Sequence, residues 1–453
     1  MNRSKQLPFS KLVEKPLTIA DWIVFFIIAF FCFVTFQQGD IFHTGGSSFA
    51  YLNGHIFDFY DYNVQYMGGN AYLPSSYILF AIWNIPVYLL RVVTIPTMAA
   101  PWIVIMWYKT LTTLFYLLSG FVIYKIGLNI GMESKKSKMM AYVFLTTPIG
   151  FFSQFIFGQY DIFTVFFVLI GIYYYFKGDL TKFAIYFGIA LTFKYFAFLI
   201  FVPLLLLKEK KILKIIKYAA ISLSFLILEI LIYYHSPAFR SGVFGFGAKD
   251  YIFAAGFQTS HTSISIIIVL WMVTCAWAYF QEVEKREDFA KYALFFCNIV
   301  NFLIFGLSMW HPQWLLFGVP FMIMSSMISE KIDIFMLLDI ILMLAFTIFT
   351  VNFWINHVDQ ALMHHGIFKN FLTEKLGENV SMRSLFKIND QKMMFSIISG
   401  IFLVNAVFKH PKFCVHDFNK DVDKHWNLIR ARFIIGVSIF VVPALICAVV
   451  SVL

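Results

Sequence analysis

An acidic residue that follows the first long apolar run of the chain could act as a general base. The run Trp22–Phe36 ends at the polar stretch Gln37-Gln38-Gly39-Asp40. An apolar run of this kind predicts a membrane-spanning helix, so Asp40 is expected at the membrane surface. A carboxylate placed there could take a proton from a hydroxyl group. The alternative interpretation is a polar stop that only ends the helix.

The segment after Asp40 is rich in small and polar residues, which would leave room for a sugar or a lipid head group. It contains Gly45 and Gly46 and several side chains that could contact an acceptor: His43, His55, Asp58 and Asp61. This variety exceeds what a connector needs. It therefore favours a site around Asp40 over a plain helix stop.

Four charged residues lie inside apolar runs, where each costs a few kcal/mol if it faces hydrocarbon. Lys109 is close enough to one surface to reach it, so a simple anchor explains it as well as a role in binding. Lys194 falls near an expected turn inside the protein, which favours contact with an anionic ligand or a paired carboxylate. Glu229 and Asp339 could each pair with a buried cation instead.

Two further motifs place polar side chains at expected helix ends. Gly158-Gln159-Tyr160-Asp161 could bind a ligand through Gln159 and Asp161, although glycine and aspartate also suit a helix stop and an N-cap. His311 precedes a proline between two tryptophans. That setting fits either a phosphate- or hydroxyl-binding imidazole or an aromatic belt at the interface.

The composition explains what must position these residues. Hydrophobic residues make up 60% of 453 positions and charged residues only 13%, with a mean hydropathy of +0.76. These values predict an all-α polytopic membrane protein. The net charge of +10 has no basic stripe with interleaved aromatics, so no nucleic-acid partner is expected. Five cysteines, four of them in apolar runs, predict neither disulfides nor a metal site.

Charge placement predicts the topology, because Lys and Arg collect in cytoplasmic loops. With the basic N-terminus inside, Asp40 lies outside. We expect 75–93 to lie along the outer surface and 183–207 to form a short re-entrant helix pair with Lys194 near its turn. Full crossings are then expected at 19–37, 102–124, 139–157, 161–176, 216–234, 263–281, 292–309, 314–329, 332–354, 393–408 and 433–453.

These segments give about 13 transmembrane segments when the re-entrant pair is counted. We expect a cytoplasmic tail over 1–18, a catalytic core over 19–330 with a structured external loop over 38–101, and a C-terminal region over 331–453. That last region carries an external loop over 355–392, in which His357 and His364 could face an acceptor. A solvated loop explains these histidines equally well.

Several motifs in this order resemble the GT-C superfamily of membrane glycosyltransferases, especially the bacterial polyprenyl-phosphate-mannose mannosyltransferase branch. They extend over roughly two thirds of the chain, within about residues 20–320. The similar motifs are Gly39-Asp40, Tyr72-Leu73-Pro74, Gly158-Gln159-Tyr160-Asp161, the stretch from Gly188 to Lys194 with Pro203, and Trp310-His311-Pro312-Gln313-Trp314.

The resemblance implies that Asp40 is the catalytic base and that Gln159, Asp161, Lys194 and His311 handle the donor or its phosphate. Arg240, Lys249 and Lys109 are further cations that could bind the phosphate. Asp40 has no adjacent second acid of the kind that some members use to bind a metal. We therefore predict no metal and no cofactor, with a lipid-phosphate-linked sugar as the donor substrate.

The expected function is an inverting glycosyltransferase that moves a hexose from a polyprenyl-phosphate donor to an external glycan, lipid-linked glycan or cell-wall polymer. The expected location is a bacterial plasma membrane, with the N-terminus cytoplasmic and the site on the external face. A transporter or flippase for lipid-linked saccharides is the main alternative, since it would use the same apolar groove and basic residues. A lipid-glycan polymerase or ligase is a further alternative.

Overall fold

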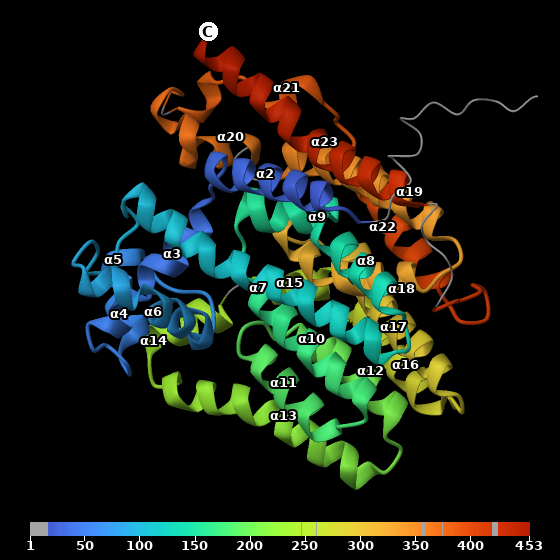
Figure 1. Ribbon diagram of the computed structural model, residues 1–453. Helices are drawn as coiled ribbons and strands as arrows, with labels where there is room; N and C mark the ends of the chain where they lie inside the picture. The colour runs from blue at the N-terminus through green and yellow to red at the C-terminus, as the bar shows by residue number, and fades with distance from the viewer. Residues whose placement is uncertain (1–16, 246, 260, 355–357, 374, 419–424) are drawn as a thin grey trace, which may run out of the picture.

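Helices account for nearly all of the regular structure in the computed structural model, which describes residues 17–245, 247–259, 261–354, 358–373, 375–418 and 425–453 (Figure 1). One antiparallel hairpin accompanies them, with Gly256 opposite Ser265. Its strands are β1 (Gly256–Gln258) and β2 (Ser263–Ser265). The expected all-α class is confirmed.

Five stretches of helix are long and apolar enough to cross a membrane, as a multi-pass membrane protein requires. One of them, Asp288–Gly306, joins α17 (Arg286–Asn301) to the π-helical η3 (Phe302–Gly306). The other four are α7 (Trp102–Asn129), α13 (Ile212–Tyr233), α19 (Ile332–Phe353) and α23 (Trp426–Val452).

Two bent helix pairs raise this number to seven if each pair is one span. The first pair is α2 (Ile19–Thr35) with α3 (Gly39–Ser47) and α4 (Phe49–Leu52), bent by 77°. The second is α8 (Ser134–Leu145) with α9 (Pro148–Phe151) and η1 (Phe152–Phe157), bent by 55°.

The expected count of about 13 segments exceeds these seven because several expected crossings form short helices. Five apolar helices have only 12 to 17 residues. They are α10 (Ile162–Lys177), α11 (Leu180–Leu191), α12 (Ala197–Lys208), α16 (Ile266–Phe280) and α22 (Gln391–Val407). The expected crossing at 314–329 is likewise split into a 3-10 turn, η4 (Pro312–Phe317), and α18 (Val319–Met327).

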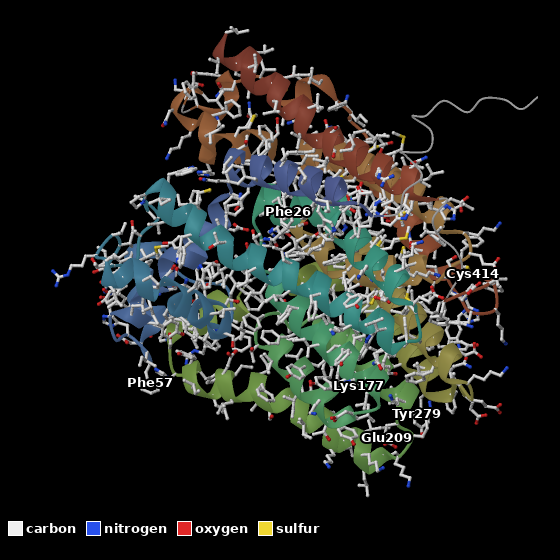
Figure 2. All side chains as sticks on the ribbon, in the orientation of Figure 1. Phe26, Phe57, Lys177, Glu209, Tyr279 and Cys414 are labelled. Carbon is white, nitrogen blue, oxygen red and sulfur yellow. The ribbon has the colours of Figure 1, made fainter. Side chains whose placement is uncertain are left out.

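Large apolar side chains stand on the outside of the molecule, as Phe26 and Phe57 show with exposed fractions of 51% and 67% (Figure 2). Polar side chains also lie at the surface. Lys177, Glu209 and Tyr279 mark the neighbouring ends of α10, α12 and α16 (Figure 2).

The segment between α2 and α7 folds into a compact group of short helices at one side of the molecule (Figure 1). In addition to α3 and α4 it contains α5 (Phe59–Met67) and α6 (Pro74–Leu89). α6 is not among the candidate spans. The indoles of Trp83 in α6 and Trp107 in α7 stack 4.9 Å apart, and each donates its N–H to the other's backbone carbonyl at 3.0 Å.

The helices α11 and α12 have 12 residues each, about 18 Å of helix, and are joined by a turn that contains Lys194. α13 packs along α11 at Gly188, where an added Cβ would lie 2.5 Å from the Phe225 ring. The chain then returns to the first loop region through α14 (Pro237–Phe239), η2 (Arg240–Phe244) and α15 (Ala248–Ala254).

The C-terminal region packs back on the first helix. Arg430 of α23 and Asp21 of α2 form an ion pair at 2.7 Å. The backbone N–H of Gln37 donates to the carbonyl of Leu362 at 3.1 Å, which places α20 against the bend that follows α2. The short elements of this region are α20 (Val358–His365), η5 (Ile367–Asn370), η6 (Leu376–Glu378) and α21 (Met382–Leu385).

Candidate active site

Asp40 lies in the first turn of α3, just beyond the 77° bend after α2. The bend turns the chain at Asp40 away from the axis of α2. Gln38 is the N-cap residue, and its side-chain oxygen accepts the backbone N–H of Asp40. The half-buried carboxylate accepts a hydrogen bond from the Gln313 amide at 3.4 Å. An acid in this position is also favoured by the positive end of the helix dipole.

Asp161 and Lys194 form a buried ion pair, with 3.2 Å between the Lys194 ammonium and a carboxylate oxygen of Asp161. Two aromatic rings also face the ammonium. The ring of Tyr72 is 4.3 Å away and that of Trp314 is 5.5 Å away. Aromatic faces and a carboxylate all attract a cation, so these three groups hold the Lys194 ammonium in place.

His311 stacks on Trp314 with 4.5 Å between ring centres and contacts Trp354 at the same distance. Burial, and then the nearby charge of Lys194, lower the pKa of His311 to about 4. The imidazole is therefore neutral at pH 7. It can donate one hydrogen bond to a phosphate or hydroxyl but supplies no positive charge.

Asp40 interacts electrostatically with both members of the Asp161–Lys194 ion pair. Burial raises the pKa of Asp40 to about 6, while the charge of Lys194 lowers it and the charge of Asp161 raises it. Burial works in this direction because it penalises the charged carboxylate. A carboxylate with a pKa near 6 is a stronger base than an ordinary aspartate and is still mostly ionised at pH 7.

An apolar cavity of about 190 Å³ adjoins these groups. Lys194, Tyr72 and Trp314 line it at the polar end. The remaining wall is apolar and comes from several segments: Ala71, Leu73, Phe193, Tyr195, Phe196, Leu226, Ile230, Val243 and Phe244. A cavity with one cation at the rim of an apolar wall suits an anionic head group joined to a hydrocarbon chain.

Two buried donors have no hydrogen-bond partner among the described residues. One is the indole N–H of Trp314, which lines the cavity, and the other is the side-chain amide of Gln159, two residues before Asp161, whose oxygen accepts the backbone N–H of Tyr160 at 2.8 Å. An unpartnered buried donor costs about 1–3 kcal/mol unless a ligand or water satisfies it. Both groups are thus available to a bound ligand.

The structure thus brings together Asp40, Asp161, Lys194 and His311 from the expected set. Four more residues belong to the same cluster, although the sequence alone assigned them no role: Gln38, Tyr72, Gln313 and Trp314. All four lie inside stretches named in the sequence analysis. The signal that could have singled them out is the density of aromatic and amide side chains within those motifs.

Lys109 does not contribute to this cluster. Its ammonium donates to three backbone carbonyls, those of Phe33 at 2.6 Å, Phe36 at 2.8 Å and Phe155 at 3.2 Å. These carbonyls belong to the ends of α2 and η1, where helices leave acceptors unpaired. We therefore assign Lys109 to the scaffold under the site rather than to phosphate binding.

Other expected site residues make local contacts. Arg240 is exposed and donates to the Tyr234 carbonyl, and Asp61 accepts the Ala238 N–H. His43 contacts the Met67 carbonyl, Asp58 pairs with His55 at the surface, and His364 contacts Asn379. His357 lies outside the described residues, as does the Lys249 side chain. The neighbouring His365 is nearer the site, since a Cβ on Gly39 would lie 3.9 Å from its ring nitrogen.

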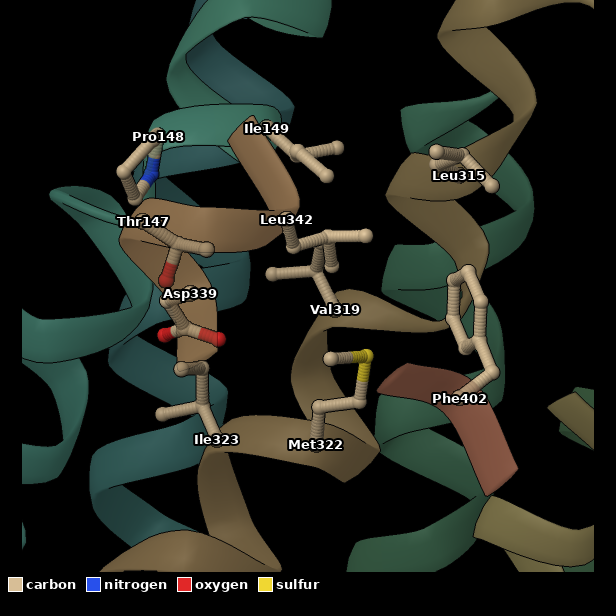
Figure 3. Close-up of a pocket in the computed structure, with 10 residues that line it drawn as sticks. All are labelled: Thr147, Pro148, Ile149, Leu315, Val319, Met322, Ile323, Asp339, Leu342 and Phe402. Atoms are coloured by element: carbon tan, nitrogen blue, oxygen red, sulfur yellow. The ribbon is translucent and has the colours of Figure 1, made fainter. Parts of the chain in front are cut away.

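The remaining two charges of the apolar runs have partners elsewhere. Glu229 accepts from Ser75, and Asp339 lies 3.4 Å from the Arg432 guanidinium. The Asp339 carboxylate sits among side chains of α9, α18 and α19 (Figure 3). The cavity there is only about 10 Å³, too small for any organic substrate.

Comparison of the chain with protein-family models, with curated proteins and with solved structures gave no match.

Proposed function

We propose that this protein is an inverting glycosyltransferase that moves a hexose from a polyprenyl-phosphate donor to a glycan, lipid-linked glycan or cell-wall polymer. The observation that carries the proposal is the meeting of Asp40 with the Asp161–Lys194 pair and His311 beside an apolar cavity. Four separate segments of the chain supply these groups. The resemblance in motif order to the GT-C superfamily supports the same reaction.

The donor would bind with its hydrocarbon chain along the apolar wall formed by Leu226, Ile230 and Phe244. Its phosphate would then lie at the polar rim, next to Lys194 and the indole N–H of Trp314. This orientation matches the two chemical parts of the donor to the two parts of the cavity. The sugar would extend from the rim toward Asp40.

In the transfer step, the acceptor hydroxyl oxygen attacks the anomeric carbon of the donor sugar. Asp40 takes the hydroxyl proton as the new carbon–oxygen bond forms. The bond between the anomeric carbon and the phosphate oxygen breaks, and its electron pair leaves with polyprenyl phosphate. Lys194 stabilises the charge that develops on this leaving group. Attack opposite the leaving group inverts the anomeric configuration.

The proposal includes the membrane arrangement expected from the charges. About 13 transmembrane segments, counting α11 and α12 as a re-entrant pair, would place the N-terminus in the cytoplasm and Asp40 on the external face of a plasma membrane. No metal ion or cofactor takes part in the proposed reaction.

The alternative is a transporter or flippase for lipid-linked saccharides. It would use the same cavity and the same lysine, but movement of the intact substrate requires no general base beside the sugar. The hydrogen bond from Gln313 to Asp40, which orients that carboxylate, favours the enzyme.

The deciding experiment supplies the purified protein in detergent with radiolabelled polyprenyl-phosphate hexose and a crude envelope glycan. We expect label to move to the glycan and polyprenyl phosphate to be released, with Asp40→Asn at least about 100-fold slower. Release by Asp40→Asn at the wild-type rate would refute the mechanism. A transporter would instead carry intact labelled donor across proteoliposomes.

A further inference from the structure

Among the described residues that line the cavity, the single cation already has an anionic partner. Lys194 lines the cavity together with Tyr72 and Trp314, while its ammonium pairs with Asp161 at 3.2 Å. A lipid phosphate that reaches this rim therefore meets a lysine whose charge is largely compensated. Binding must either add a second anion to one lysine or replace the first.

Replacement is favoured because Asp161 has a second set of partners. It is the N-cap residue of α10, yet its side chain makes no capping hydrogen bond. The hydroxyl of Thr164, three residues further on, is buried and has no hydrogen-bond partner among the described residues. A carboxylate released from Lys194 could accept from this hydroxyl, and the positive end of the α10 helix dipole also favours it there.

The donor and the product differ in charge, so Asp161 does not compete equally with the two for Lys194. The donor phosphodiester carries one negative charge, whereas a phosphate monoester carries about 1.5 to 2 at neutral pH. Without a competitor, Lys194 would hold the product more tightly than the donor. A carboxylate that returns to Lys194 counteracts this preference.

We infer that Asp161 is a positioning residue that competes with the lipid phosphate for Lys194, yielding the lysine when the donor binds and reclaiming it to expel polyprenyl phosphate. The inference rests on the proposed function for the identity of the phosphate. It assigns the Asp161–Lys194 pair to the turnover cycle instead of to static stabilisation of the fold.

The test measures equilibrium binding of farnesyl phosphate to the purified full-length protein, with farnesol as the uncharged control. We expect Asp161→Asn to bind farnesyl phosphate about five- to tenfold more tightly than wild type, because one competing charge has been removed. Lys194→Met should bind it more weakly. Affinity for farnesol should be the same in all three proteins.

A matched control is Asp288→Asn, which removes the carboxylate from a different ion pair, 2.9 Å from Lys291. It should leave farnesyl phosphate binding unchanged. Unchanged or weaker binding by a folded Asp161→Asn protein would overturn the inference, since it would mean that Asp161 only orients Lys194. Thermal unfolding of each variant separates this result from a loss of fold.

Turnover gives a second readout. In the transfer assay, Asp161→Asn should be inhibited by farnesyl phosphate at about five- to tenfold lower concentration than wild type. If wild type transfers no hexose at all, the proposed function fails, while the binding measurement still decides whether Asp161 competes for Lys194.

Discussion

The side-chain amide of Gln313 lies 3.4 Å from a carboxylate oxygen of Asp40, although 273 positions separate the two residues in the chain. This hydrogen bond fixes one oxygen of the proposed base and leaves the other for a substrate. We expect Gln313→Leu to lower kcat by about tenfold with little change in KM, because the base loses its orientation and not its charge. Steady-state kinetics on labelled donor would measure this. An unchanged kcat would show that the hydrogen bond does not act in catalysis.

The pH dependence of transfer should follow the ionisation of Asp40. Burial raises its pKa to about 6. A base works when deprotonated, so kcat/KM should rise with pH through about 6 and level off above it. The charged groups that act on Asp40 are Lys194, which lowers its pKa, and Asp161, which raises it. The pH at which kcat/KM is half-maximal should therefore rise in Lys194→Met and fall in Asp161→Asn. If this midpoint is unchanged in both variants, the pH dependence comes from the ionisation of another group.

The two tryptophans around His311 should differ in their effects. Trp314 lines the cavity, and its indole N–H has no partner in the part of the chain that the structure describes. Trp314→Phe should therefore raise KM for the donor by about three- to tenfold through the loss of one hydrogen bond. Trp310 donates instead to the Phe305 carbonyl at 2.9 Å. Trp310→Phe should lower the unfolding temperature and leave KM unchanged. Equal KM values for the two variants would exclude Trp314 as a donor ligand.

Lys109 should matter for folding and not for binding. Lys109→Met leaves three carbonyls without their ammonium donor and should destabilise the protein by about 2–4 kcal/mol. Thermal unfolding in detergent would measure the loss, with the exposed Lys125→Met as the control. If Lys109→Met changes KM for the donor but leaves the unfolding temperature unchanged, Lys109 takes part in donor binding.

The topology can be tested by cysteine accessibility. If α6 lies on the outer surface and α7 crosses once, cysteines at Arg91 and Lys135 should react with impermeant reagents from opposite sides of the membrane. Labelling of both from one side would show that the number of crossings between them is even, and the external placement of Asp40 would lose its support.

Many of the helices can be predicted from the sequence because apolar runs and basic loops alternate along the chain. The fold has three features where the sequence predicts them: the first helix ending just before Phe36, the break around Lys194 and the long helix that begins at Trp102. The number of crossings is harder to predict. Runs such as 161–176 form helices too short to be assigned by length, and packing decides how they lie.

The site was predictable in part. The sequence singles out Lys194 as a charge that is costly to bury, and it places Asp40, Asp161 and His311 at expected helix ends. The structure brings these four residues into one cluster. The sequence cannot show that the Lys109 ammonium donates its hydrogen bonds to backbone carbonyls. Those bonds depend on how the ends of α2 and η1 approach α7. The hydrogen bond from Gln313 to Asp40 likewise depends on tertiary packing alone.

The paired indoles of Trp83 and Trp107 have a consequence for substrate traffic. Because each ring holds the backbone of the other helix, α6 is locked to α7 and cannot swing aside as a hinged cover without breaking both bonds. The long-chain donor of the proposed reaction would then reach the cavity from the side, past α13, whose Leu226 and Ile230 line it.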